Sequence, residues 1–174
     1  MRLLRWLLRL GPRIPADTLG IHDLSGGAAE PLLAADRAAL ATLFRRVSES
    51  SDAPPRSTLL LLYCTIGADG AILNSPRTLR EIIRDAGASV VIVATPNPRR
   101  CYGLAARRQR QLARANLLLT LDRRGGAFGV FVKRLVTEMK DGTSMPRAWA
   151  RLVRQTSERP RTLLACELGR LALR

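Results

Sequence analysis

Histidine is almost missing from this chain of 174 residues, which contains only His22. Zinc sites in proteins draw most of their ligands from His and Cys, so a single histidine argues against a His-based metal site. Cysteine is also scarce, and the three cysteines are widely spaced and form no CxxC pair. An odd and scattered set of cysteines does not build a disulfide framework, so we expect a protein of the reducing cytoplasm. We expect it to hold no metal or other cofactor.

Acidic residues are few as well. The 29 Lys and Arg residues outnumber the 14 Asp and Glu residues, which gives a formal charge of +15. The excess is concentrated between residues 99 and 124, where eight arginines accompany one acid, Asp122. Such a basic segment binds phosphates, faces an acidic partner or faces only solvent, and the sequence leaves these three readings open. The candidate partner-binding residues are Arg99, Arg100, Arg107, Arg108, Arg110 and Arg114.

Aromatic residues make up 4% of the chain, which leaves little for stacking on nucleic-acid bases. No apolar run is long enough to span a membrane. Residues 1–15 form a basic amphipathic segment, but Arg5 and Arg9 interrupt its apolar residues and exclude a secretory signal. This segment is a short interfacial helix, a helix docked on its own domain, or the stub of a longer protein.

Apolar residues are plentiful, at 47%, and residues 16–174 are expected to form a single domain with a basic insertion at about 99–124. Apolar runs separated by amphipathic stretches predict a parallel α/β sheet with helices on both faces. We expect the runs 58–63 and 89–94 to be adjacent parallel strands joined by a right-handed crossover through a helix at 78–86. Further strands are expected at 16–21 and 162–166, and a short strand or helix turn at 116–121. Further helices are expected at 31–47, 99–114, 127–140 and 144–155.

Two reactive side chains follow predicted strands. The apolar run 58–63 ends in Cys64, before a loop that starts near Gly67, and His22 follows the weaker strand 16–21. Parallel strands end on the same edge of a sheet, and that edge is where α/β proteins bind ligands. We therefore expect Cys64 and His22 to share a cleft. The plainer interpretation is that Cys64 is a buried small hydrophobe and that His22 is a hydrogen-bonded neighbour of Asp23.

The order of these motifs resembles that of CHAT domains, a caspase-like family of clan CD cysteine peptidases. The resemblance rests on His22, Leu-Leu-Tyr-Cys64-Thr-Ile-Gly67, Asp85-Ala-Gly-Ala-Ser-Val-Val-Ile-Val-Ala-Thr-Pro96, Gly126-Ala-Phe-Gly-Val-Phe and Lys140-Asp-Gly-Thr-Ser. It implies a three-layer α-β-α sandwich with a mainly parallel central sheet. Two positions depart from the family pattern: Asp23 stands where glycine is usual after the histidine, and Thr65 stands where an acid often follows the cysteine.

The resemblance implies a cysteine endopeptidase with Cys64 as nucleophile and His22 as its base. Asp23, Thr65 and Gly67 would support the loop and the oxyanion site. Its substrate would be a protein, a regulatory or sensor protein would be its partner, and its setting a bacterial defence or signalling system. Two alternatives stay open: an inactive scaffold with the same fold, and a nucleic-acid-binding α/β protein that uses the arginines of residues 99–124.

Overall fold

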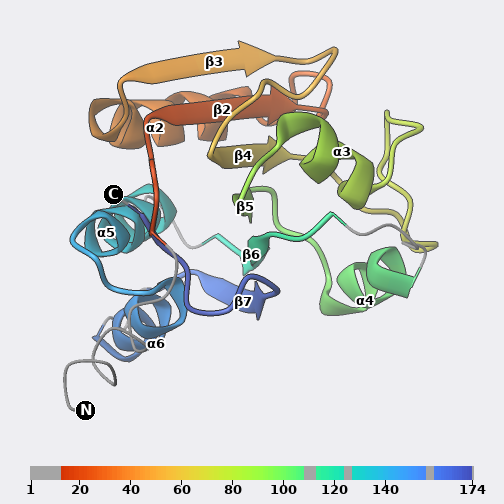
Figure 1. Ribbon diagram of the computed structural model, residues 1–174. Helices are drawn as coiled ribbons and strands as arrows, with labels where there is room; N and C mark the ends of the chain where they lie inside the picture. Colours follow the sequence, from red (N-terminus) through yellow and green to blue (C-terminus); the bar gives the residue numbers. More distant parts are fainter. Residues whose placement is uncertain (1–12, 108–112, 124–126, 156–158, 174) are drawn as a thin grey trace.

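The computed structural model describes residues 13–107, 113–123, 127–155 and 159–173 (Figure 1). Six strands form one sheet in the order β3-β2-β4-β5-β6-β7, and β7 is its antiparallel member. The sheet strands are β2 (Thr18–Asp23), β3 (Arg46–Ser50), β4 (Leu59–Tyr63), β5 (Val90–Val93), β6 (Asn116–Asp122) and β7 (Arg161–Cys166). A separate parallel pair joins β1 (Arg13–Ile14) to β8 (Ala172–Leu173).

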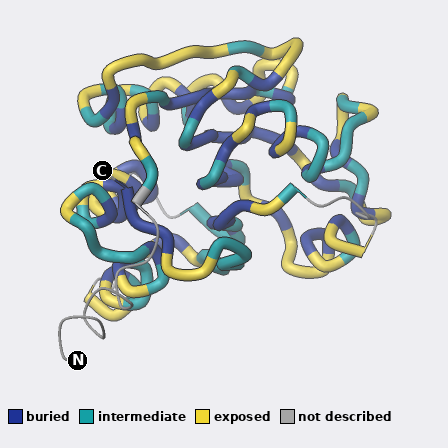
Figure 2. The backbone as a smooth tube through the Cα atoms, viewed as in Figure 1, coloured by how far each residue is buried: buried dark blue, intermediate teal, exposed yellow. Residues whose placement is uncertain are grey.

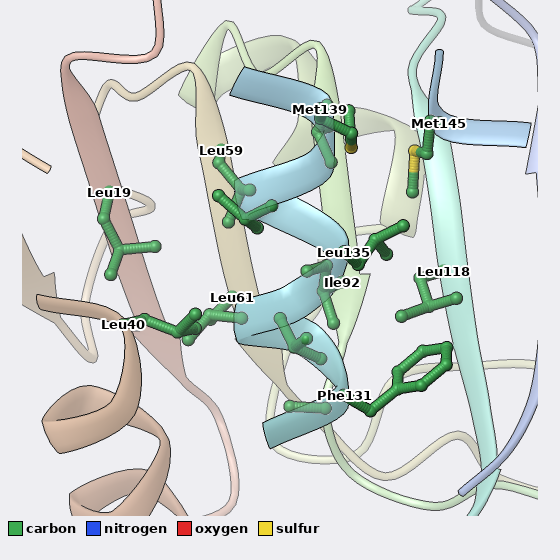
Figure 3. Packing of buried hydrophobic residues seen from close by; sticks show 14 of the residues in the cluster. Leu19, Leu40, Leu59, Leu61, Ile92, Leu118, Phe131, Leu135, Met139 and Met145 are labelled. Carbon is green, nitrogen blue, oxygen red and sulfur yellow. The ribbon is translucent and has the colours of Figure 1, made fainter. Parts of the chain in front are cut away.

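Helices cover both faces of this sheet, which makes the domain a three-layer α-β-α sandwich. The helices are α2 (Glu30–Leu40), α3 (Leu79–Ala86), α4 (Arg99–Arg107), α5 (Ala127–Lys140) and α6 (Met145–Gln155), with a 3-10 turn η1 (Ala41–Leu43) after α2. On one face α2, α5 and α6 pack on alternate strand residues such as Leu59, Leu61 and Ile92 (Figure 3). On the other face α3 and α4 pack on the intervening residues, including Leu60 and Leu62.

The centre of the sheet is apolar on both sides. Every residue of β4 and β5 is buried, and these strands are dark blue in Figure 2. They are adjacent and parallel, in a register that pairs Leu59 with Val90, and α3 lies between them in the chain. The predicted pairing of 58–63 with 89–94 is therefore confirmed, as is the predicted class of fold.

Helix α3 shows how local sequence sets the limits of an element. The Thr78 side chain accepts a hydrogen bond from the Glu81 N–H, and the Glu81 carboxylate accepts one from the Thr78 N–H, which completes a capping box. The helix ends at Gly87, whose φ of 62° lies in the left-handed region that glycine tolerates. The helix predicted at 78–86 lies within one residue of these observed bounds.

The prediction of one helix over 31–47 is wrong beyond Leu40. After α2 and η1 the chain forms β3, an edge strand that pairs with β2. The strand Arg46–Ser50 is exposed or half-exposed throughout and shows no apolar alternation, so its sequence carries no strand signal. The apolar residues Leu43 and Phe44 extended the helical spacing past the point where the helix ends.

Other predicted elements are corrected in detail. The helix expected at 99–114 ends at Arg107 in the described residues, and residues 108–112 lie outside them, as do residues 1–12 of the basic amphipathic segment. The rest of the expected basic insertion belongs to the sandwich itself, because α4 covers one face and β6 is an interior strand of the sheet. The strand expected at 162–166 is β7, and it runs antiparallel to β6.

The strand order creates a switch point between β2 and β4. From β2 the chain passes through α2 to β3 on one side of β2, and then crosses to β4 on the other side. In open α/β sheets the carboxyl ends of the strands at such a point frame the usual ligand site. The residues that end β2 and β4 are therefore the first place to look for a functional site.

Gly70, in the loop after β4, allows a close approach between that loop and α4. Its φ is 82°, and a Cβ there would lie 2.6 Å from backbone atoms of Leu104 and Ala105. Gly87 has a similar φ but open space around it. We expect Gly87→Ala to lower the free energy of unfolding by about 1 kcal/mol, from the left-handed backbone alone. Gly70→Ala should cost about 2–4 kcal/mol, because overpacking adds to the same strain.

Urea denaturation of the two variants measures this difference. Equal losses in the two variants would show that the loop does not rest on α4 at Gly70.

Candidate functional site

His22 lies on β2 and Cys64 directly follows the adjacent strand β4, at the same edge and on the same face of the sheet. His22 pairs with Leu62 in the parallel register of β2 and β4, and paired residues point to the same face. Cys64 follows Leu62 by two residues and packs with it in the cluster beneath α3 and α4. Strand spacing and rise place the two Cα atoms about 8 Å apart. Both residues therefore lie at the carboxyl edge of the sheet.

The His22 ring is held from the β3 side. Its Nδ1 lies 2.8 Å from the carbonyl oxygen of Ser50, and the side chain is 1% exposed. A carbonyl can only accept, so Nδ1 carries the hydrogen and Nε2 is the basic nitrogen of the neutral ring. Burial lowers the pKa of His22; the Ser50 carbonyl opposes this, and nearby Arg77 adds to it. The histidine is therefore neutral near pH 7.

The Cys64 thiol is shielded in this structure. The residue is 0% exposed, and burial raises the pKa of its thiol to about 12. Among the described residues no hydrogen bond joins Cys64 to His22, whose ring leans toward the strand on the opposite side of β2. A small pocket nearby is lined by residues 70–72, 75–79 and Ala105 and includes neither side chain. The two residues share a face, but the expected open cleft is not formed.

A tight hairpin follows Cys64. Gly67 donates its N–H to Ala71 O (2.8 Å), and Leu73 donates to Thr65 O (2.9 Å). The Gly67 amide is thus committed to the hairpin, and it supports the loop rather than an oxyanion. Thr65 is exposed next to Cys64. The Asp23 carboxylate accepts a hydrogen bond from the Ser25 N–H (2.8 Å), so it shapes the loop after β2.

Sequence reasoning missed Asn97, which binds the backbone on both sides of Thr65. Its Oδ1 accepts from the Ile66 N–H (2.7 Å), and its Nδ2 donates to Cys64 O (3.1 Å). Asn97 is 1% exposed and follows β5 at the same edge of the sheet. Its signal in the sequence is its position between two prolines directly after a buried strand, where a polar side chain is fixed at the carboxyl edge.

A second polar cluster, also missed, lies at this edge on the other face. Arg123 makes two hydrogen bonds to the Asp36 carboxylate, at 2.7 and 2.8 Å, and the Tyr63 hydroxyl donates to the same carboxylate at 2.7 Å. The guanidinium lies 4.0 Å from the ring centroid of Phe128. Burial, followed by the Asp36 charge, raises the pKa of Tyr63. The available signal was an aspartate on the apolar face of α2, between Leu33 and Leu40.

The basic residues of the 99–124 segment lie on the surface where the structure describes them. Arg99, Arg100, Arg107 and Arg114 are exposed, while Arg108 and Arg110 lie outside the described residues. Cys101 is buried on the inner face of α4, and Cys166 is half-buried in β7. Within the described ranges none of the three cysteines forms a disulfide.

Comparison with known proteins adds no relative: no family model, no curated protein and no solved structure matches this chain. In the part of the chain that the structure describes, no three His, Cys, Asp or Glu side chains are placed to hold a metal ion. None of the described helices has the length and apolar character needed to cross a bilayer. The proposed function therefore rests on the geometry at the carboxyl edge of the sheet.

The pH dependence of stability should report on His22. A lowered pKa means that the unfolded chain, with a His pKa of 6.5, binds a proton more readily than the folded chain. The stabilising contribution is complete above the unfolded pKa and is lost as pH falls toward the folded pKa. Since His22 is the one histidine, we expect the free energy of unfolding to fall between about pH 7.5 and about pH 5.5.

His22→Asn, whose amide can still donate to the Ser50 carbonyl, should remove most of that slope. Urea titrations at each pH measure it, and an unchanged slope in the variant would contradict the assignment.

The Asp36 cluster should contribute strongly to stability. Asp36→Asn leaves the Arg123 charge buried without its counter-ion, and we expect a loss of about 3–5 kcal/mol. Tyr63→Phe removes one hydrogen bond to a charged group and should cost about 1.5–3 kcal/mol. Chemical denaturation of both variants tests the order, and a larger loss for Tyr63→Phe would contradict it.

Proposed function

We propose that this protein is a cysteine peptidase in which Cys64 is the nucleophile and His22 is the general base. One observation carries the proposal: the register of β2 and β4 places both residues on one face of the sheet at its switch point. A nucleophile, a base and a group that orients the base form the usual covalent catalytic set. The Ser50 carbonyl fits the third role, since it holds Nδ1 and leaves Nε2 as the base.

The reaction would follow from these roles. His22 Nε2 takes the proton of the Cys64 thiol, and the thiolate attacks the carbonyl carbon of a peptide bond. The tetrahedral intermediate collapses as the imidazolium donates its proton to the departing amine. Water, deprotonated by the same nitrogen, then hydrolyses the thioester and releases the carboxylate product and the free thiol. The substrate is a protein, and a bacterial defence or signalling system is its proposed setting.

The resting conformation would be inactive. A buried thiol with a pKa of about 12 stays protonated at neutral pH, and the His22 ring is turned toward Ser50. Catalysis therefore requires the hairpin that begins at Ile66 to move, so that substrate reaches the thiol and Nε2 while Cys64 keeps its place in the sheet. Catalytic contacts often tighten only when substrate is bound, which is compatible with the separation of the two side chains here.

Cysteine variants test this proposal. We expect Cys64→Ala to abolish cleavage of a diverse peptide library, followed by mass spectrometry, while lowering stability by only about 1–2 kcal/mol. Cys101→Ala is the matched control, because Cys101 is buried in the same apolar cluster, and it should retain cleavage. His22→Asn should lower cleavage at least about a hundredfold, because it removes the base. Full cleavage by the Cys64→Ala variant would refute the proposal.

A second candidate is a non-catalytic scaffold with the same fold. The complete burial of Cys64 favours it, because buried cysteines without a base in contact are usually inert. This scaffold would show no cleavage in the wild-type chain and no labelling of Cys64 by electrophilic peptides. The nucleic-acid alternative draws on the exposed arginines of α4, and it requires binding whose affinity falls steeply with salt.

A further inference from the structure

The hydrogen-bond ladder between β4 and β5 meets a proline just beside Cys64. Val90 donates its N–H to Thr58 O (3.1 Å), and Ala94, two ladder steps further on, donates its N–H to Leu62 O (2.8 Å). Each step of a parallel ladder advances two residues. The next step would bring the N–H of residue 96 to Cys64 O. Residue 96 is Pro96, which has no N–H, so the ladder cannot continue through the main chain.

The side chain of Asn97 supplies what Pro96 lacks. In a continued ladder, residue 96 would donate to Cys64 O and accept from the Ile66 N–H. Asn97 does both with one carboxamide, since Nδ2 donates to Cys64 O (3.1 Å) and Oδ1 accepts from the Ile66 N–H (2.7 Å). The amide therefore takes the place of a missing peptide group and keeps residues 64–66 aligned with the sheet.

Asn97 is itself held from several directions. Its own N–H donates to Thr120 O (3.0 Å), which ties the segment to β6. Nδ2 also donates to Thr95 O (3.0 Å) and lies 3.4 Å from the Tyr102 hydroxyl. Pro96 and Pro98 on either side restrict the backbone at this point. The amide is thus pre-oriented by β5, β6 and α4 before it contacts the segment after β4.

We propose that Asn97 is the positioning residue of Cys64. By extending the ladder past the end of β5, it keeps Cys64 in strand geometry, and strand geometry turns the thiol to the face that carries His22. This inference rests on the proposed peptidase for its catalytic meaning. Asn97 does not touch the reacting atoms; it acts through the Cys64 and Ile66 backbone.

The test compares two buried asparagines that bind backbone in the same way. Asn116 is 0% exposed, donates to Gly169 O (3.1 Å) and accepts from the Leu168 N–H (2.9 Å), at the opposite end of the sheet. Asn97→Asp and Asn116→Asp each replace an amide donor by a carboxylate oxygen. Both variants are made with Cys101→Ala and Cys166→Ala, so that Cys64 is the only thiol. Asn97→Ala and Asn116→Ala form a second pair, should either aspartate prevent folding.

Two measurements follow the backbone at Cys64 directly. The first is the rate of Cys64 alkylation by iodoacetamide, and the second is hydrogen exchange at the Ile66 amide. We expect Asn97→Asp to raise the alkylation rate at least about tenfold, because the hydrogen bond to Cys64 O is lost. Asn97→Ala should raise both rates by at least that factor, because the Ile66 N–H also loses its acceptor. Asn116→Asp should leave both within about twofold of the parent, even with a similar loss of overall stability. Equal alkylation rates in the two aspartate variants would overturn the proposal.

Peptide cleavage supplies the third measurement. A positioning role predicts that Asn97→Asp lowers kcat at least about tenfold with KM changed less than about threefold, since thiol placement is lost while substrate contacts remain. An unchanged kcat beside faster alkylation would overturn the catalytic role of Asn97. If the parent chain cleaves no peptide, the proposed function fails, and alkylation and exchange then decide whether Asn97 holds Cys64.

Discussion

The burial of β4 on both faces is the constraint on which the rest of the structure depends. Five consecutive apolar residues, Leu59–Tyr63, have no solvent side, so the strand is stable only with neighbours on both edges and helices on both faces. This requirement produces the three layers. It also carries the chain straight from the interior to the sheet edge, and so it delivers Cys64 to that edge as a shielded, protonated thiol.

Polar side chains complete each face at the carboxyl edge. Tyr63 and Cys64 are consecutive and point to opposite faces, where they meet different partners. On the Tyr63 side, Asp36 and Arg123 tie α2 and the end of β6 to β4. On the Cys64 side, Asn97 binds the backbone that leaves β4. Buried polar groups need such partners, so both clusters stabilise the edge as well as shape it.

The sequence predicts the structure correctly where the residues of one helix or strand determine its conformation by themselves. The apolar runs of β4 and β5, the caps of α3 and the placement of Cys64 and His22 at one edge all follow from local patterns. The sequence does not predict features that depend on contacts between distant segments. β3 is a strand because it pairs with the free edge of β2. β7 runs antiparallel to β6 because two helices, α5 and α6, separate them and bring the chain back to the carboxyl edge. Asn97 and Asp36 gain their roles from partners 31 and 87 residues away, and no local spacing reveals these.

A site held by one side chain can open more easily than one held by a backbone ladder. To release the hairpin that begins at Ile66, Asn97 must give up its hydrogen bond from the Ile66 N–H, at a net cost of about 0.5–1.5 kcal/mol, while it keeps its bond to Cys64 O. A conformation at that energy is populated without any ligand. The β4–β5 ladder itself need not break, because Pro96 has already ended it. The same proline therefore explains why Cys64 is held by Asn97 and why the segment after it can move while the sheet stays intact.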